Sequence, residues 1–289
     1  MNRWIVGARV RTLPAALVPV FVGTALVVGE NEEIIWWRAV SALLVALALQ
    51  VGVNYANDLS DGLRGTDGKN RVGPQRLVGS ELALPDEVRS AAWIAFGFAG
   101  VIGLFLSIVV TPWLLIVGGL AIVAGWLYTG GRHPYGYFGL GEVSVFLFFG
   151  LVATLGTTYI QIERLTGLHV LAATAVGLLA CALLAINNLR DIEGDRAFGK
   201  QTLAVRLGNR LARWLYIGFL DGGLILGSLC ALERPWCLLV LLGGIPAGKA
   251  VRRVLSGAQG QELVAVLSLT SGVQVLSGFL LAVGLALGS

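Results

Sequence analysis

The sequence predicts an all-α integral membrane protein, with nine transmembrane helices arranged as two four-helix units plus one around a central cavity open to the cytoplasm. Three observations support this fold class. Hydrophobic residues make up 56% of the 289 residues and charged residues only 13%, whereas charged residues are roughly 25% of an ordinary soluble domain. The 40 glycines are expected where membrane helices pack through small residues. The third observation is a succession of apolar windows along the chain.

Windows of about 20 apolar residues locate the expected membrane spans. They are 13–29, 39–56, 91–110, 112–128, 139–160, 168–188, 214–232, 236–248 and 264–287. The first window follows three arginines but carries no convincing cleavage site, so we interpret it as a retained helix and not as a signal peptide. We expect one polytopic domain, 1–289, in which 13–128 and 139–248 form an internal repeat and 264–287 is an additional helix.

The distribution of basic residues predicts the orientation of these spans. All but three of the 21 Lys and Arg residues fall in the N-terminal segment and in alternate loops, and the three exceptions are Arg38, Arg164 and Arg234. Because cytoplasmic loops are enriched in Lys and Arg, we expect the N-terminus and the cavity opening in the cytoplasm. The same rule places the C-terminus outside.

A first acidic cluster ends the second expected span. It contains Asn54, Asn57, Asp58 and Asp61, and at 100° per residue Asn54, Asp58 and Asp61 share one face of a helix. Asn57 stands one turn before Asp61. Carboxylate and amide oxygens suit Mg²⁺, which keeps several waters and commonly bridges to phosphate oxygens.

A second cluster repeats this pattern at the end of the sixth span. Asn187, Asp191 and Asp195 follow one another at i, i+4 steps, and Asn188 lies beside them. Because the offset between the two spans is even, both clusters end at the same membrane face. We therefore predict two Mg²⁺ ions held by Asp58, Asp61, Asp191 and Asp195. The alternative, that these are solvated loop carboxylates, does not explain the matched spacing.

Cations near the clusters predict an anion clamp. Lys69, Arg76, Arg190 and Lys200 lie within reach by sequence and would complete the binding of a diphosphate. Each of them can also be explained as a determinant of topology alone.

A loop rich in Gly, Pro and aromatic residues follows the fourth span, from Tyr128 to Glu142. We interpret it as a lid over the cavity in which Tyr128 and Arg132 touch the substrate; the alternative is an ordinary connector with interfacial tyrosines. Glu142 and Asp221 are ionisable groups near lipid depth and are candidates for function. Hydrogen bonding between helices explains Asp221 equally well.

The cysteines and histidines argue against a zinc site or a disulfide framework. Cys181, Cys230 and Cys237 show no CxxC spacing, and the two histidines are far apart in the chain. Cys230 and Cys237 flank one short loop, but we expect buried free thiols.

The combined motifs resemble the UbiA superfamily of intramembrane aromatic prenyltransferases. Asn57-Asp58-x-x-Asp61, Asp191-x-x-x-Asp195 and the loop from Tyr128 to Arg132 carry the resemblance. Further stretches are similar to the menaquinone branch of that superfamily: 54–67, 73–76, 134–142, 187–191 and 199–206. The match runs from about Arg9 to Gly208.

The sequence departs from the superfamily at two positions. Gly65 stands where many members have a third Asp, and Asp67 follows two residues later. Arg132 stands where many relatives have Lys. Arginine does not readily lose its proton, so we expect Arg132 to hold diphosphate or a substrate carboxylate.

The resemblance implies an Mg²⁺-dependent enzyme of the bacterial inner membrane. It would transfer a polyprenyl group from polyprenyl diphosphate to 1,4-dihydroxy-2-naphthoate with loss of CO₂, giving demethylmenaquinol and diphosphate. The catalytic residues would be Asp58, Asp61, Asp191, Asp195, Tyr128 and Arg132. The substrate-binding residues would be Asn54, Asn57, Asp67, Lys69, Arg76, Tyr135, Glu142, Asn187, Asn188, Arg190 and Lys200.

Two alternatives remain open at this stage. One is a related prenyltransferase with another aromatic acceptor, such as 4-hydroxybenzoate, haem or a chlorophyll precursor. The other is a transporter that binds a metal or an anion between two repeats. We expect no nucleic-acid partner, and the sequence gives neither the length of the prenyl chain nor the oligomeric state.

Overall fold

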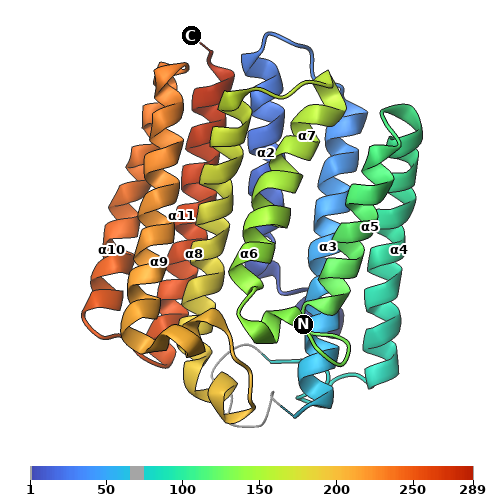
Figure 1. The fold of residues 1–289 in the computed structure, drawn as a ribbon, viewed down its shortest axis with the longest axis vertical. Coiled ribbons are helices and arrows are strands. Elements are labelled where there is room, and N and C mark those ends of the chain that lie inside the picture. Colours follow the sequence, from blue (N-terminus) through green and yellow to red (C-terminus); the bar gives the residue numbers. More distant parts are fainter. Residues whose placement is uncertain (1, 66–74, 289) are drawn as a thin grey trace.

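The computed structural model describes residues 2–65 and 75–288, apart from the side chain of Arg11. All regular elements of the described chain are helices, and it contains no strand. Its long helices run side by side along one axis of the molecule (Figure 1). In order, the elements are α1 (Arg3–Ala8), η1 (Val10–Thr12), α2 (Pro14–Gly29), α3 (Trp36–Leu63), α4 (Pro85–Val109), α5 (Trp113–Leu127), η2 (Tyr135–Phe138), α6 (Gly141–Val145), η3 (Phe146–Val152), α7 (Ala153–Ile162), α8 (Gly167–Ala197), α9 (Leu203–Leu229), η4 (Cys230–Leu232), η5 (Pro235–Gly243), α10 (Gly244–Leu255) and α11 (Gln261–Ala286).

The long apolar helices confirm a multi-pass membrane protein. Within the described ranges, six continuous helical stretches are long and apolar enough to cross a membrane, and α2 and α5 are shorter apolar helices. The six are Trp36–Leu63, Pro85–Val109, Gly141–Ile162, Gly167–Ala197, Leu203–Leu232 and Gln261–Ala286. Each window predicted from the sequence overlaps one or more of the helices given above.

Several helices extend beyond the predicted windows, and three of them bear on the site. We predicted ends at residues 56 and 188, whereas α3 continues to Leu63 and α8 to Ala197. Both acidic clusters therefore lie on helix and not in loops, because backbone hydrogen bonding continues after the apolar residues end. The third helix, α9, begins at Leu203 and bends at Gly208, whose φ of 74° and ψ of 167° are not helical.

Local sequence signals explain several helix starts. Pro14 and Pro85 occupy first-turn positions of α2 and α4, where a missing N–H costs no helical hydrogen bond. The Thr202 hydroxyl accepts a hydrogen bond from the backbone N–H of Val205 at the start of α9. A threonine N-cap also begins α8. The Thr202 cap fixes the end of the loop 198–202 where α9 begins.

The buried hydrophobic residues form two clusters. The larger one is built around α8, α9 and α11 with part of α2, and it includes Val176, Leu179 and Leu220. The smaller one joins α3 to α4 around Tyr55 and Phe96. All three cysteines are buried free thiols, as predicted.

A π-helical segment interrupts the helix that packs against α8. The segment, η3, lies between α6 and α7. A Cβ atom added to its Gly150 would lie 2.4 Å from the Cα atom of Gly177 on α8. The two backbones therefore touch here, which requires glycine on both sides. Single π-helical turns occur frequently at functional sites.

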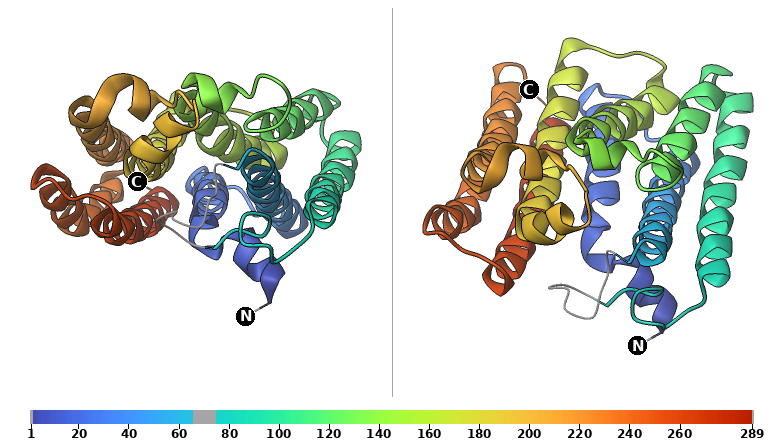
Figure 2. Two further views of the ribbon diagram at one scale, coloured as in Figure 1. Left: turned by 90° about the horizontal axis from the view of Figure 1, so that it is seen from below. Right: turned by 60° about the horizontal axis from the view of Figure 1, so that its bottom comes forward.

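The two acidic clusters lie at the same end of the bundle. The C-terminal ends of α3 and α8 are both at the lower end in Figure 1, and the C-terminus of the chain is at the upper end. The view from below in Figure 2 shows α3 and α8 on either side of the middle of the bundle. The helices thus carry both clusters to one face of the molecule.

Candidate active site

A cavity of about 2000 Å³ lies between the helices. Its lining on α3 runs from Ala42 to Asp61, which corresponds to about 28 Å at 1.5 Å per residue. Asp61, Asp191 and Asp195 line one end, and most of the remaining wall is apolar. The cavity is therefore a long apolar channel with a polar end.

Lys200 bridges the two acidic clusters. Its Nζ atom lies 3.9 Å from Oδ1 of Asp61 on α3 and 3.6 Å from Oδ1 of Asp195 on α8. Burial alone would lower the pKa of Lys200, but the two carboxylates raise it above its ordinary value. The side chain thus remains a charged ammonium between two carboxylates that are far apart in the sequence.

Tyr137 adds a second connection at this end. Its hydroxyl donates a 2.9 Å hydrogen bond to Oδ1 of Asp61, and Lys200 and Arg64 lie 5.0 Å and 4.8 Å from its ring centroid. Burial and the charge of Asp61 raise the pKa of Tyr137, so the phenol stays a neutral donor. Neither Tyr137 nor Arg64 was among the predicted site residues.

Asp191 pairs with its neighbour in the sequence. Nε and Nη2 of Arg190 donate hydrogen bonds of 2.7 Å and 2.6 Å to its two carboxylate oxygens. This is the bidentate geometry that arginine also offers to phosphate. Both residues line the cavity, together with Asn187 and Asn188.

The structure corrects the expected position of Asp58. Its side chain is fully buried and is absent from the cavity lining. Its two oxygens accept hydrogen bonds from the backbone N–H groups of Leu77, at 2.9 Å, and Val78, at 3.0 Å. Three residues turn a helix by about 300°, so Asp58 points to the segment 75–80 while Asp61 faces the cavity.

The segment held by Asp58 brings Gln75 and the predicted Arg76 to the cavity wall. Arg76 is 8% exposed, so it is a buried cation at the polar end. Two further predicted residues, Asp67 and Lys69, lie outside the described residues.

The predicted pair of Tyr128 and Arg132 is separated in the structure. Tyr128 lines the cavity. Arg132 is exposed and does not line the cavity. The chain turns outward at Gly131, whose φ is +77°. Arg64 fixes this turn by donating to the carbonyl oxygens of Thr129 and Gly131.

The predicted amides at the polar end are held in different ways. Asn57 lines the cavity and accepts a 2.7 Å hydrogen bond from Thr129. Asn54 donates to the carbonyl oxygen of Ala8 at 2.9 Å. Both side chains are therefore fixed by segments outside α3.

Two predicted residues act at the cavity wall through hydrogen bonds. The Tyr135 hydroxyl donates to the carbonyl oxygen of Ala124 at 2.9 Å and lies 2.8 Å from the Ser144 hydroxyl. Glu142 is buried behind the wall, and its Oε1 accepts a 3.0 Å hydrogen bond from Asn188. Glu142 thus orients a lining amide and does not itself line the cavity.

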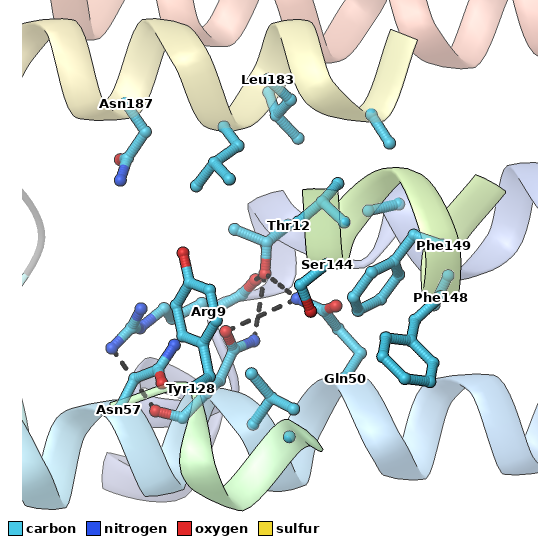
Figure 3. Close-up of a pocket in the computed structure, with 18 of the residues that line it drawn as sticks. Arg9, Thr12, Gln50, Asn57, Tyr128, Ser144, Phe148, Phe149, Leu183 and Asn187 are labelled. Atoms are coloured by element: carbon cyan, nitrogen blue, oxygen red, sulfur yellow. Dashed lines mark hydrogen bonds between the residues drawn. The ribbon is translucent and has the colours of Figure 1, made fainter. Parts of the chain in front are cut away.

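The structure also adds polar lining residues that sequence reasoning missed. They include Arg9, Thr12, Gln50 and Ser144 (Figure 3). Gln50 could have been found from the sequence, because it is the only amide in the apolar run 39–53. Arg9 could not have been found in this way, since a basic residue before a first span is expected for topology alone.

The predicted candidate Asp221 does not belong to the site. It is exposed on α9 and does not line the cavity.

The polar end fits Mg²⁺ by the chemistry of its donors. In the described part of the chain, no three His, Cys, Asp or Glu side chains lie close enough to form a metal cluster by themselves. Mg²⁺, however, is usually held by one or two carboxylates, water and substrate phosphates. The lysine ammonium between Asp61 and Asp195 also shows that this end attracts a cation.

Comparisons with known proteins agree with these features. The family model described as "UbiA prenyltransferase family" matches residues 16–271. The 1,4-dihydroxy-2-naphthoate octaprenyltransferase of Mycobacterium tuberculosis is 46% identical over 99% of this chain and 97% of the relative. The protein of the same name from Escherichia coli is 37% identical over 98% and 95%.

Solved structures share the fold at low sequence identity. An apo UbiA homologue from Aeropyrum pernix K1 has a TM-score of 0.73 and 14% identity, covering 95% of this chain and 98% of that one. A UbiA homologue from Archaeoglobus fulgidus bound to DMAPP and Mg²⁺ has a TM-score of 0.65 and 14% identity, covering 98% and 99%. The transporter alternative is therefore wrong, and this chain is an enzyme that belongs to the UbiA prenyltransferase family.

Proposed function

We propose that this enzyme transfers a polyprenyl group from polyprenyl diphosphate to 1,4-dihydroxy-2-naphthoate, with loss of CO₂ and with Mg²⁺ bound. The products are demethylmenaquinol and diphosphate. The observation that carries the proposal is the Lys200 ammonium between Asp61 and Asp195 at the polar end of a long apolar cavity. The acceptor follows from the name shared by the relatives from M. tuberculosis and E. coli.

The polar end would bind the diphosphate. Asp61, Asp191 and Asp195 line it and would hold two Mg²⁺ ions, which supply positive charge to the leaving diphosphate. Lys200 and Arg190 would donate charge-assisted hydrogen bonds to the diphosphate oxygens. Arg76, carried by the segment that Asp58 fixes, would close the clamp from a third side.

The apolar part would hold the prenyl tail. When the bond between the allylic carbon and the diphosphate oxygen breaks, the allylic group becomes cationic and reacts with any nearby water. The channel wall, which includes Phe148, Phe149 and Leu183, would exclude that water. Aromatic faces also attract a cation, so the rings would favour the reacting group in this position.

The neutral phenols of Tyr128 and Tyr137 would serve as hydrogen-bond donors at the reacting end. Tyr137 holds Asp61 in place, and Tyr128 faces the cavity. A new carbon–carbon bond forms between the allylic carbon and the naphthalene ring, and the bond from the ring to the carboxylate breaks. The electron pair of that second bond returns to the ring, so carbon dioxide leaves without a net change in protons.

An assay of the purified protein in detergent tests this function. Dihydroxynaphthoate and 4-hydroxybenzoate are each supplied with polyprenyl diphosphate, in Mg²⁺ and in EDTA. We expect prenylated product and one CO₂ per diphosphate from dihydroxynaphthoate in Mg²⁺ only. Faster turnover of 4-hydroxybenzoate would replace the proposed acceptor, and full activity in EDTA would remove Mg²⁺ from the proposal.

We also propose the membrane arrangement that the sequence predicts. Nine crossings, with the short helices α2 and α5 and the pair η5–α10 included, put the N-terminus and the cavity opening in the cytoplasm and the C-terminus outside the inner membrane. The units 13–128 and 139–248 would form the repeat, with 264–287 as the extra helix. The distribution of basic residues supports this orientation. Labelling of single cysteines at residues 3 and 287 from either side of the membrane tests it.

A further inference from the structure

An exposed group of cations on α10 takes no part in the proposed reaction. Lys249, Arg252 and Arg253 are all exposed, and at 100° per residue they share one face of the helix. The buried residues of α10, among them Ala247 and Ala250, lie on its other side. None of the three cations lines the cavity. We refer to Lys249, Arg252 and Arg253 as the α10 cationic face.

The three cations belong to a helix and not to the loop that follows it. We predicted that the span ends at residue 248, whereas α10 continues to Leu255. Lys249 lies six residues before that end, which is about 9 Å along the helix axis. Ile245 is exposed one turn before Lys249. An apolar surface that suits hydrocarbon chains therefore continues directly into a cationic surface on the same side of α10.

No described carboxylate forms an ion pair with any residue of the α10 cationic face. Lys249 and Arg253 are also four residues apart in the helix, a spacing at which like charges repel each other. The three positive charges are thus uncompensated within the part of the chain that the structure describes.

The opposite edge of the bundle is arranged differently at the same end. Figures 1 and 2 show α10 at one edge and α4 at the other. At the α4 edge, Arg3 pairs with Glu87 at 3.0 Å, and Arg89 pairs with Asp86 at 2.7 Å. Basic residues at either edge would satisfy the rule that sets membrane orientation. Topology alone therefore does not explain why cations without acidic partners are concentrated on α10.

The neighbouring helix α9 extends this surface. Arg213 donates to the carbonyl oxygens of Val254 and Ala258, which ties α9 to the end of α10. Close to it in the sequence, Arg210 and Trp214 are exposed on α9. Arg210 adds a fourth cation near this level, and tryptophan is enriched at the boundary between hydrocarbon and headgroups. The α10 cationic face therefore lies at the level of lipid headgroups.

The loop after α10 connects the cationic face to the wall of the cavity. This loop, 256–260, begins three residues after Arg253, and its Gln259 and Gly260 line the cavity. The bond from Arg213 to Ala258 holds the same loop. A ligand that fixes the end of α10 would thus also fix a stretch of the cavity wall.

We propose that the α10 cationic face binds the phosphate headgroup of an anionic phospholipid. The headgroup contacts the three cations, and an acyl chain runs along Ile245 and the exposed leucines of η5, Leu241 and Leu242. Clusters of Lys and Arg beside membrane helices recognise anionic lipids in this way. The bound lipid offsets the repulsion between the cations and stabilises the end of α10 together with its loop. This site goes beyond the proposed reaction and is separate from the diphosphate end.

Lipid binding to the purified protein tests this site. Delipidated protein in a non-ionic detergent is titrated with phosphatidylglycerol or with phosphatidylcholine, and native mass spectrometry measures the bound lipid. Wild type should bind phosphatidylglycerol about tenfold or more tightly than phosphatidylcholine, which has no net charge. Lys249→Gln/Arg252→Gln/Arg253→Gln should bind phosphatidylglycerol roughly a hundredfold more weakly than wild type. Equal affinities of the two proteins would overturn the proposal.

This measurement contains neither acceptor nor Mg²⁺, so a failure of the proposed function leaves its outcome unchanged. Matched variants test the charge and the position of the site. Arg252→Lys/Arg253→Lys keeps the charges and should retain most of the binding. Arg3→Gln/Arg89→Gln removes two paired cations of the α4 edge and should bind phosphatidylglycerol like wild type. A loss in this control as large as in the triple variant would show a response to net charge alone and contradict a site on α10.

Thermal unfolding of wild type gives a test that needs no variant. Phosphatidylglycerol should raise the unfolding temperature more than phosphatidylcholine does. The difference should shrink in about 1 M NaCl, because salt screens exposed charges. Equal shifts with the two lipids would contradict the site.

Polyprenyl diphosphate is the competing occupant, because it also joins phosphate groups to an apolar chain. We expect that it does not displace phosphatidylglycerol from wild type, and that KM for polyprenyl diphosphate in the triple variant stays within about twofold of wild type. Displacement together with a higher donor KM would assign the α10 cationic face to the prenyl donor and overturn the proposal.

Discussion

Lys200 lies 3.9 Å from Asp61 although the two residues belong to different halves of the chain. The loop between α8 and α9 carries Lys200 across the polar end of the cavity to a carboxylate of α3. The same ammonium lies 3.6 Å from Asp195. One cation thus connects two acidic helix ends that are far apart in the sequence.

Replacement of this lysine should weaken binding of the prenyl donor. In Lys200→Gln, Asp61 and Asp195 lose their shared counter-ion, and the diphosphate loses a charge-assisted donor. We expect KM for polyprenyl diphosphate to rise about tenfold or more, with Lys200→Arg closer to wild type. Initial rates at varied donor concentration measure this effect, and an unaltered donor KM would exclude Lys200 from the diphosphate site.

Asp61→Asn should abolish most turnover without unfolding the protein. The change keeps the shape of the side chain and its hydrogen bond with Tyr137, but it removes a proposed metal ligand. We expect a loss of at least about a hundredfold in kcat and a higher Mg²⁺ requirement. Asp221→Asn is the matched control, because Asp221 is exposed on α9, and comparable losses in the two variants would refute the assignment.

Asp58→Ala should act mainly through stability. It leaves the buried N–H groups of Leu77 and Val78 without their acceptor, at a cost of about 2–4 kcal/mol. Thermal unfolding in detergent should therefore shift downward. The Mg²⁺ concentration for half-maximal rate should stay near that of wild type in the remaining activity, and a large increase would show that Asp58 binds the metal after all.

Gly150→Ala should be destabilising because the helices touch at their backbones. An added Cβ would lie 2.4 Å from Gly177 Cα, and overpacking of this kind costs about 1–3 kcal/mol. Gly218→Ala on α9 meets no neighbour within 4 Å and should be neutral or stabilise by about 0.5 kcal/mol. Thermal unfolding of both variants in detergent measures the difference. Equal unfolding temperatures would mean that η3 and α8 are not in contact at Gly150.

The sequence predicted the convergence of the two clusters but not the roles within them. The i, i+4 spacing and the even offset between spans were enough to bring Asp61 and Asp195 to one end. They were not enough to predict the direction of the Asp58 side chain. A rotation of about 60° around the helix axis decides whether a side chain of α3 faces the cavity or the segment 75–80. The position of the segment 75–80, which receives Asp58, depends on tertiary packing.

Other site residues depend on contacts that no local pattern encodes. Arg132 follows a turn at Gly131 that directs it to the surface, whereas its neighbour Tyr128 remains at the cavity. Arg9 reaches the backbone carbonyl oxygen of Asn54 only because α1 folds against α3. Composition, periodicity and charge therefore predict the helical membrane fold and the acidic end, and they leave the other polar residues of the cavity unpredicted.

The π-helical segment η3 has a consequence for the shape of the channel. A π-helical turn contains one residue more than an α-helical turn, so deleting a single residue there would restore ordinary helix. Everything after the deletion would keep its direction relative to α6, because the π-helical turn accommodates the extra residue locally. The row of α7 residues that now lines the channel, which includes Gly156 and Thr157, would stay in place. Insertion or deletion at η3 can thus change the channel wall at this one turn, while α7 and the chemistry at the opposite end stay intact.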